Sequence, residues 1–303
     1  MKIIYFNKKR KNSTIVLAMG TFDGVHKGHK KLITEAIKFA KKNNLPCFAM
    51  TFDPHPQEVV NPGRGLCLLT TLQERIELMR ELGLDGVIVK EFNGKISRLS
   101  PEAFIKTFLI DQLKVRKIFV GYDFAFGRNR TGGVSILKKL GLEVHAVSPF
   151  KAHGHLVKSS TIRSMIADGN LYEAVKLLGH PYILTGTVVK GAGRGKGLGF
   201  PTANITVAKD KLIPKHGVYA GQLITHNSKL KAAVFIGSRP TFGKESFAIE
   251  AHVLGFRGNL RGRTVRIELL KRLRDEIHFS DVEKLKAQIK KDVEVIRRFR
   301  SSP

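Results

Sequence analysis

Two histidines follow a glycine-containing turn near the start of the chain. The turn runs from Gly20 to Val25, and His26 and His29 come directly after it, separated by Lys27 and Gly28. Imidazole N–H groups donate hydrogen bonds to phosphate oxygens, and glycine lets an anion approach the backbone closely. The pattern predicts a phosphate site made by the two histidines and by Gly20, Phe22, Asp23, Gly24 and Gly28. The alternative is a plain strand-to-helix turn that carries two surface histidines.

The segments on either side of this turn favour the phosphate site. The apolar run 15–19 predicts a buried strand, and residues 31–41 place their apolar side chains at helical spacing. The first backbone N–H groups of a helix lack partners within the helix, and the positive end of its dipole lies there. A strand, a glycine turn and a helix together therefore predict an anion-binding geometry.

Three later stretches follow predicted strands or open a predicted helix. His55 lies between two prolines that fix the backbone, so it is either a ligand contact or part of a rigid turn. The loop 121–132 carries aromatic residues and two arginines between glycines, and it suits a flat ring and phosphates. The run 158–163 is either a helix cap or a second anion site.

The first half of the chain alternates strands and helices, which predicts a doubly wound α/β domain. Further strands are predicted at 46–52, 86–89, 117–120 and 142–147, and helices at 72–82, 101–110 and 134–140. Ligands of this fold bind at the carboxyl ends of the strands. The glycine and histidine loops fall at those ends.

The second half has short β-rich runs broken by glycine, which predict a small antiparallel barrel. Strands are predicted at 183–189, 218–224, 231–236, 247–254 and 264–270, followed by a helix over 281–299 that Ser280 caps. We therefore expect two domains, residues 1–182 and residues 183–303.

A loop with five glycines in nine residues lies between the first two barrel runs. Its N–H groups, with Arg194 and Lys196, could surround a triphosphate. Thr202 and Asn204 follow it and offer oxygen ligands on one side of an extended segment, which suits Mg²⁺. The alternative is a flexible linker. The predicted nucleotide contacts in this loop are Gly191, Gly195, Lys196 and Gly199.

The net charge of +28 raises the question of nucleic-acid binding. Residues 1–182 contain 29 basic and 15 acidic residues and residues 183–303 contain 24 and 10, so each part carries +14. An even spread favours anionic substrates over a nucleic-acid-binding arm. No apolar run has the length of a membrane span, so we expect a cytoplasmic protein. We also expect a monomer or a weak homo-oligomer.

The motifs resemble those of the bacterial bifunctional riboflavin kinase/FAD synthetase family. The first half contains G-T-F-D-G-V-H-K-G-H, T-F-D-P-H-P-Q-E, G-Y-D-F-A-F-G-R-N-R-T-G and S-S-T-I-R in the family's order. The second half contains G-L-G-F-P-T-A-N, G-V-Y-A, I-G-S-R-P-T-F, I-E-A-H-V-L and L-R-D-E-I-H-F-S. The resemblance implies that the second half phosphorylates riboflavin to FMN with MgATP. The first half would then transfer AMP from ATP onto FMN, which gives FAD and pyrophosphate.

The resemblance also implies roles for particular residues. His26 and His29 would hold the ATP phosphates, and Glu250 would act as the base that orients or deprotonates the riboflavin hydroxyl. Thr202 and Asn204 would bind Mg²⁺ and phosphate oxygens. Ser159, Ser160 and Arg163 would hold the departing pyrophosphate, and Lys158 is a further phosphate-binding candidate. The flavin candidates are His55, Asp123 and Phe126 in the first half, and Arg274, a contact of flavin or phosphate, in the second.

Two alternatives to this interpretation stay open. The family usually carries a basic residue shortly before the serine pair, as in R-x-S-S-T-x-[IV]-R, whereas this chain has Lys158 directly before Ser159 and Ser160. The segment 254–262 lacks two acids and a tyrosine that the family often has there. One alternative is therefore a protein that retains a single activity. The other, suggested by the charge alone, is a basic RNA-binding or regulatory protein on the same fold.

Overall fold

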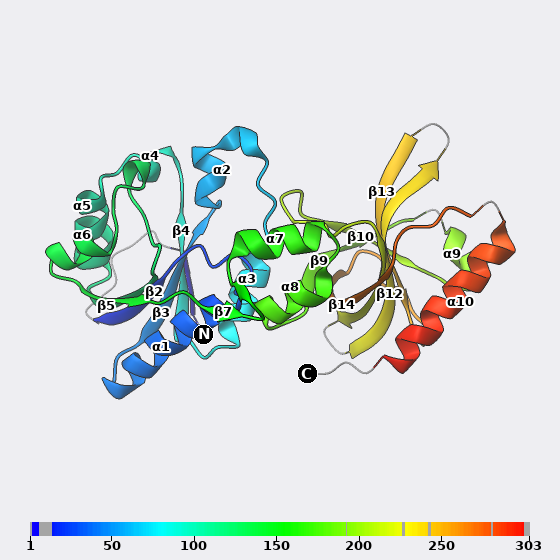
Figure 1. Cartoon of the computed structure of the whole chain (residues 1–303), viewed down its shortest axis with the longest axis horizontal. Helices are drawn as coiled ribbons and strands as arrows, with labels where there is room; N and C mark the ends of the chain where they lie inside the picture. The colour runs from blue at the N-terminus through cyan, green and yellow to red at the C-terminus, as the bar shows by residue number, and fades with distance from the viewer. Residues whose placement is uncertain are drawn as a thin grey trace. The chain divides into compact units, whose positions relative to one another are not determined.

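The chain divides into two compact units, residues 1–159 and residues 160–303. The computed structural model describes residues 2–5, 14–191, 193–225, 228–241, 244–279 and 281–299 (Figure 1). Helix α7 (Ser159–Ala167) begins at the division, and helix α8 (Leu171–Leu178) lies in the second unit. The boundary after residue 182 stays a prediction.

The first unit is built on a six-stranded parallel sheet with the order β1-β4-β3-β2-β5-β6. Its strands are β1 (Lys2–Tyr5), β2 (Ile15–Met19), β3 (Cys47–Asp53), β4 (Gly86–Glu91), β5 (Val115–Gly121) and β6 (Glu143–Val147). A short antiparallel pair follows, β7 (Lys151–Ala152) and β8 (His155–Leu156). The helices are α1 (Lys27–Lys42), α2 (Pro56–Val60), η1 (Pro62–Arg64), α3 (Leu72–Arg80), α4 (Gly94–Ser97), α5 (Pro101–Phe104), η2 (Ile105–Gln112), η3 (Arg128–Arg130) and α6 (Val134–Lys139).

Burial explains why β2 lies at the centre of this sheet. All five of its residues are buried, which fits a parallel strand covered on both faces. Helix α1 buries one apolar stripe, which includes Ile33, Ala36 and Ala40, and leaves Lys38, Lys41 and Lys42 exposed. The predicted doubly wound α/β class is confirmed.

The strand order places a ligand crevice at β2. The chain runs outward from β2 to β3 and β4, and then crosses back to add β5 and β6 on the other side of β2. In open α/β sheets, ligands bind at the carboxyl ends of the strands where the order reverses. The loops that leave β2 and β5 therefore meet at the position expected for a site.

One predicted helix differs from the observed structure. Residues 101–110 were expected to form a single α-helix, but α5 changes at Ile105 into the wider π-helical turns of η2. Ile105, Phe108 and Leu109 are all buried along η2 in the apolar core. The packing of these side chains overrides the local preference for an α-helix. The predicted cap is confirmed, because the Ser100 hydroxyl accepts the Ala103 N–H.

The second unit contains a closed antiparallel barrel of six strands with the order β10-β13-β12-β11-β14-β9. Its strands are β9 (Tyr182–Val189), β10 (Ala203–Val207), β11 (Gly217–Thr225), β12 (Ser228–Thr241), β13 (Lys244–Val253) and β14 (Thr264–Arg274). Val265, Ile267 and Leu269 alternate along β14 and are buried, as the interior of a small barrel requires. The predicted barrel is confirmed. The short helix α9 (Arg194–Gly197) lies in the connection between β9 and β10.

The helix α10 (Val282–Arg298) packs against the barrel strand β12. Val293 and Ile296 form its buried stripe. Its N-cap is Asp281, whose carboxylate accepts the Glu283 N–H at 2.8 Å. The predicted cap, Ser280, lies outside the described residues.

Candidate functional site

The turn after β2 has an unusual backbone that packing holds in place. Phe22 and Val25 have φ angles of +52° and +37°, and Gly24 has +82°. A positive φ costs a residue other than glycine about 1–3 kcal/mol, so neighbouring contacts must impose it. The Phe22 and Val25 side chains are fully buried, and the Val25 N–H donates to the Phe22 carbonyl at 3.0 Å. The turn is therefore fixed before any ligand arrives.

Asp23 fixes the turn to the segment before α3. Its buried carboxylate accepts the N–H groups of Leu69 at 3.1 Å and Thr70 at 2.9 Å, and also the Thr70 hydroxyl. The Gly24 N–H in turn donates to the Thr70 hydroxyl oxygen at 2.9 Å. These bonds place Asp23 in a supporting position. A direct contact of Asp23 with phosphate stays a prediction.

The two histidines lie together at the start of α1. His26 is the N-cap, and its Nδ1 accepts the His29 N–H at 3.2 Å. The neutral His26 ring therefore carries its proton on Nε2. The two rings are stacked with centroids 3.6 Å apart. We call this pair, with the turn 20–25, the histidine site.

The environment keeps His29 neutral. Burial, then the neighbouring His26 and Arg75, lower the pKa of His29 well below its usual value near 6.5. Its Nδ1 is buried and has no hydrogen-bond partner among the described residues. Since a neutral imidazole still has one N–H, His29 can donate a hydrogen bond to an anion without carrying a charge. A Cβ at position 28 would lie 3.2 Å from the His26 ring, so there is little room for a side chain here.

Lys158 and the first residue of α7, Ser159, lie close to the histidine site. The Ser159 hydroxyl donates to the Asp23 carbonyl at 2.9 Å. Lys158 Nζ lies 3.4 Å from Asp123 Oδ2, in the loop that leaves β5. The Tyr122 hydroxyl and the Asp123 carboxylate raise the pKa of the Lys158 ammonium, so a cation is retained at this end of the sheet.

Other predicted contacts of the first half have clear structural positions. His55 is buried and caps α2, where its Nδ1 accepts the Gln57 N–H at 3.2 Å. Phe126 stacks on Phe124 at 5.3 Å between ring centroids and packs on the apolar core. A Cβ on Gly20 would lie 3.2 Å from the Phe22 ring. Ser160 and Arg163 belong to the second unit, and their predicted contact with pyrophosphate stays a prediction.

The sequence patterns missed three residues that support the histidine site. Arg75 on α3 is almost completely buried, and it donates to the Thr51 hydroxyl at 3.0 Å. Thr51 at the end of β3 donates to the Thr21 carbonyl at 2.8 Å. Thr70 holds Asp23, as described above. An arginine or threonine on an ordinary helix or strand gives no sequence signal, because its role depends on distant segments.

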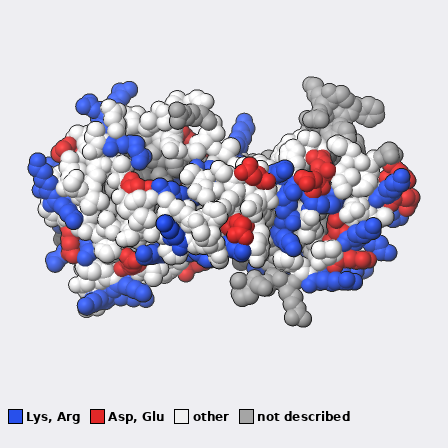
Figure 2. Space-filling model, viewed as in Figure 1, with Lys and Arg blue, Asp and Glu red and all other residues white. Residues whose placement is uncertain are grey.

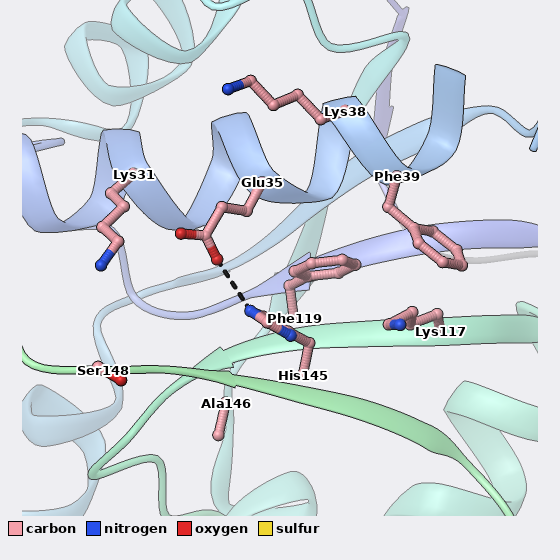
Figure 3. Close-up of a pocket in the computed structure, with 9 residues that line it drawn as sticks. All are labelled: Lys31, Glu35, Lys38, Phe39, Lys117, Phe119, His145, Ala146 and Ser148. Carbon is pink, nitrogen blue, oxygen red and sulfur yellow. Dashed lines mark hydrogen bonds and ion pairs between the residues drawn. The ribbon is translucent and has the colours of Figure 1, made fainter. Parts of the chain in front are cut away.

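A pocket of about 500 Å³ lies elsewhere in the first unit, between α1 and the strands β5 and β6 (Figure 3). Glu35 reaches from α1 to His145 on β6, with 2.9 Å between Oε2 and Nε2, and the Lys117 ammonium lies 4.1 Å from the centre of the Phe39 ring. None of the predicted site residues lines it. The lining residues are Lys31, Glu35, Lys38, Phe39, Lys117, Phe119, His145, Ala146 and Ser148.

The second unit brings together the oxygen-bearing residues predicted for a metal and a base. The Thr202 hydroxyl donates to Glu250 Oε2 at 2.7 Å. Asn204 on β10 is directly opposite Glu250 on β13, with Val189 of β9 on its other side. Hydroxyl, amide and carboxylate oxygens are the ligands that Mg²⁺ prefers. We call Thr202, Asn204 and Glu250, with the loop 191–199, the glycine-loop site.

The glycines of this loop allow close approaches that a side chain would prevent. A Cβ on Gly191 would lie 2.0 Å from Asn204 Nδ2, and one on Gly195 would lie 2.5 Å from the Phe200 carbonyl oxygen. Gly199 has a φ of +85°, and a Cβ on it would meet nothing within 4 Å. The Lys196 side chain lies outside what the structure describes. The loop therefore folds back onto Asn204 because Gly191 has no side chain.

Two further residues of the barrel have defined partners. The Arg274 guanidinium binds the Asp292 carboxylate of α10, with Nη2 and Oδ2 2.8 Å apart. The predicted contact of Arg274 with flavin or phosphate stays a prediction, and it would have to share or replace this ion pair. His252 Nδ1 lies 2.9 Å from the Pro201 carbonyl oxygen and so supports the segment before Thr202. The sequence patterns did not single out this histidine.

The sequence matches two family models, one after the other. Residues 8–161 match the model described as FAD synthetase, and residues 178–300 match the model described as riboflavin kinase. The first match contains the histidine site and the second contains the glycine-loop site.

Curated relatives match almost the whole chain. The chain is 36% identical to a bifunctional riboflavin kinase/FMN adenylyltransferase of Buchnera aphidicola subsp. Schizaphis graminum, with 99% of both chains covered. It is 38% identical to the protein of that name from Listeria monocytogenes and 36% identical to the one from Escherichia coli K12. Each of these two matches covers 94% of this chain and 92% of the relative.

A solved structure shares the fold over nearly its full length. It is titled a macrolide-efflux protein from Streptococcus pneumoniae, and it superposes with a TM-score of 0.89 at 30% identity, covering 98% of this chain and 99% of its own. Among the residues that the structure describes here, no helix is both long and apolar enough to cross a membrane.

Proposed function

Because the chain belongs to the family of bifunctional riboflavin kinase/FMN adenylyltransferases, we propose that its two sites each carry out one of two consecutive reactions. The glycine-loop site phosphorylates riboflavin to FMN. The histidine site transfers AMP from ATP onto FMN and releases pyrophosphate, which gives FAD. The observation that carries this assignment is that each family match contains one of the sites and excludes the other.

In the first reaction the terminal ribityl hydroxyl of riboflavin attacks the γ-phosphorus of ATP. The bond from the γ-phosphorus to its bridging oxygen breaks, and ADP leaves. Glu250 accepts the hydroxyl proton, and the Thr202 hydroxyl bound to Oε2 holds this carboxylate in orientation. The N–H groups of the loop 191–199 surround the phosphates. Phosphoryl transfer depends mainly on positioning and on stabilisation of charge, which the backbone N–H groups and the oxygen-bearing side chains of this site would supply.

Mg²⁺ fits the residues at this site. Thr202, Asn204 and Glu250 offer neutral and anionic oxygens within one small region. When bound there, Mg²⁺ would neutralise phosphate charge. Thr202 and Asn204 are the residues proposed to hold it.

In the second reaction an FMN phosphate oxygen attacks the α-phosphorus of ATP, and the bond from the α-phosphorus to the β-phosphate oxygen breaks. No covalent intermediate with the protein is needed, and catalysis rests on orientation and charge stabilisation. His26 and His29 donate hydrogen bonds to the phosphates. Lys158 and Ser159, with Ser160 and Arg163, are proposed to assist the departing pyrophosphate. The proposed flavin contacts at this site are His55, Asp123 and Phe126, whereas Arg274 is the proposed flavin or phosphate contact of the kinase reaction.

The charge of the protein is compatible with its anionic substrates. Lys and Arg side chains occur over both units on the face drawn in Figure 2, and Asp and Glu side chains lie between them. We propose ATP, riboflavin and FMN as the partners. A specific nucleic-acid partner is not proposed, and the cytoplasmic location and the monomeric or weakly oligomeric state stay predictions.

Chromatography of the products made from riboflavin, ATP and Mg²⁺ tests this proposal. We expect FMN to form first and FAD to follow, and excess chelator to stop both reactions. FMN without FAD would mean that only the kinase operates. The absence of both products would contradict the proposal and favour a binding protein.

Gly191→Ala is expected to slow riboflavin phosphorylation by about 10²-fold, because the added methyl group would displace the Asn204 side chain. FAD formation from supplied FMN should not change. Gly197→Ala is the matched control, since a Cβ at Gly197 meets nothing within 4 Å. Rates of FMN formation by the two variants provide the measurement, and an equal effect of both substitutions would contradict the role given to Gly191.

A further inference from the structure

The side chain of Arg75 is 1% exposed, although it carries a charge. Burial of a guanidinium costs free energy unless hydrogen bonds compensate, and arginine is rarely buried to this extent. Its Nη1 donates to the Thr51 hydroxyl at 3.0 Å and to the Phe52 carbonyl at 3.3 Å, and its Nη2 donates to the Thr70 carbonyl at 3.4 Å. The guanidinium therefore connects the end of β3 with the segment before α3.

Both of these segments hold the turn of the histidine site. A hydroxyl has one hydrogen, so Thr51 Oγ1, which accepts from Arg75, donates onward to the Thr21 carbonyl at 2.8 Å. On the other side, Thr70 binds the Asp23 carboxylate and the Gly24 N–H. Arg75 thus orients the Thr51 hydroxyl toward the Thr21 carbonyl. It also binds the carbonyl of Thr70, the residue that makes the bonds to Asp23 and Gly24.

The same guanidinium acts on the histidines through its charge. Together with burial and His26, it lowers the pKa of His29. A cation near a neutral hydrogen-bond donor also adds positive potential where a polyphosphate would bind. Geometry and charge therefore act on the same site from one buried residue.

We propose that Arg75 is a positioning residue for adenylyl transfer, which holds the turn 20–25 through Thr51 and Thr70 and so presents the histidine pair to ATP. This inference rests on the proposed function of the histidine site. Arg75 does not need to touch the substrate to act in this way.

Three variants separate the parts of this role. Arg75→Met removes the charge and the hydrogen bonds, Arg75→Lys keeps a charge but loses the planar set of donors, and Thr51→Val removes only the link to Thr21. For Arg75→Met we expect kcat for FAD formation from FMN to fall about 10²-fold, with a smaller change in the KM for ATP. Arg75→Lys should recover part of that loss, and Thr51→Val should lower kcat by about 10-fold.

Nuclear magnetic resonance of labelled histidine supplies a readout that a general loss of stability would not move. The His29 signal, assigned by its absence in His29→Gln, should titrate at higher pH in Arg75→Met, because a nearby positive charge is gone. It should stay low in Arg75→Lys and in Thr51→Val. Riboflavin phosphorylation by each variant should stay within about twofold of the unmodified protein.

The outcomes distinguish the inference from the proposed function. If the unmodified protein makes no FAD from FMN, the proposed function fails. If it makes FAD and Arg75→Met does so equally well, the role of Arg75 is overturned. Should Arg75→Met fail to fold, Thr51→Val decides, and an unchanged kcat in that variant overturns the connection through Thr51.

Discussion

Glu250→Gln is expected to reduce FMN formation from riboflavin by about 10²- to 10⁴-fold, the usual contribution of a general base. Glutamine keeps the size of the side chain and can still accept the Thr202 hydroxyl hydrogen bond, but it cannot take up a proton. The fold of the barrel should therefore survive while the chemistry stops. Initial rates of FMN formation at saturating riboflavin and MgATP provide the measurement.

The same chain supplies the control for this variant. FAD formation from supplied FMN should be unchanged, because the histidine site lies in the other matched region. Glu294→Gln removes an exposed carboxylate from α10 of the same unit and should leave both reactions intact. A parallel loss of both activities in Glu250→Gln would contradict a separate kinase site.

His29→Ala is expected to give the opposite result, with FAD formation from FMN reduced by about 10²- to 10³-fold and FMN formation unchanged. That magnitude is typical when one donor that stabilises developing charge is removed. Because burial and two neighbouring groups keep His29 neutral in the free protein, a neutral donor should replace part of its function. We therefore expect His29→Gln to retain more activity than His29→Ala in an assay of pyrophosphate release.

His145→Ala is a matched control for this substitution. His145 lies in the same unit, is exposed on β6 and pairs with Glu35 rather than with the histidine site. It should leave both reactions unchanged. If His145→Ala lowered FAD formation as much as His29→Ala, the effect would belong to the stability of the unit and not to the site.

Local patterns were sufficient for the elements that carry the sites. The buried strand at 15–19, the glycine turn and the helix after it are all specified by neighbouring residues, and each was predicted close to its observed position. The same holds for barrel strand β14, where the alternate residues Val265, Ile267 and Leu269 are buried. Thr202 and Asn204 were placed together because two residues separated by one share a side of an extended segment.

Roles that depend on distant residues could not be read from the sequence. Asp23 and Arg274 stand in motifs that suggest ligand contacts, yet their hydrogen bonds go to Thr70 and Asp292. Arg75 lies in an ordinary amphipathic helix, and only the folded chain brings it to Thr51. A sequence pattern shows which side chains are available, whereas the partner of a buried charge is set by packing between segments.

The central claim is that two reactions occur in order on one chain, with phosphoryl transfer first and adenylyl transfer second. Two parallel incubations with riboflavin and Mg²⁺ test it most directly, one with ATP labelled at the γ-phosphorus and one with ATP labelled at the α-phosphorus. We predict that the γ label enters FMN and is retained in FAD, while the α label enters FAD alone. An α label that enters no flavin, or a γ label absent from FMN, would contradict the account.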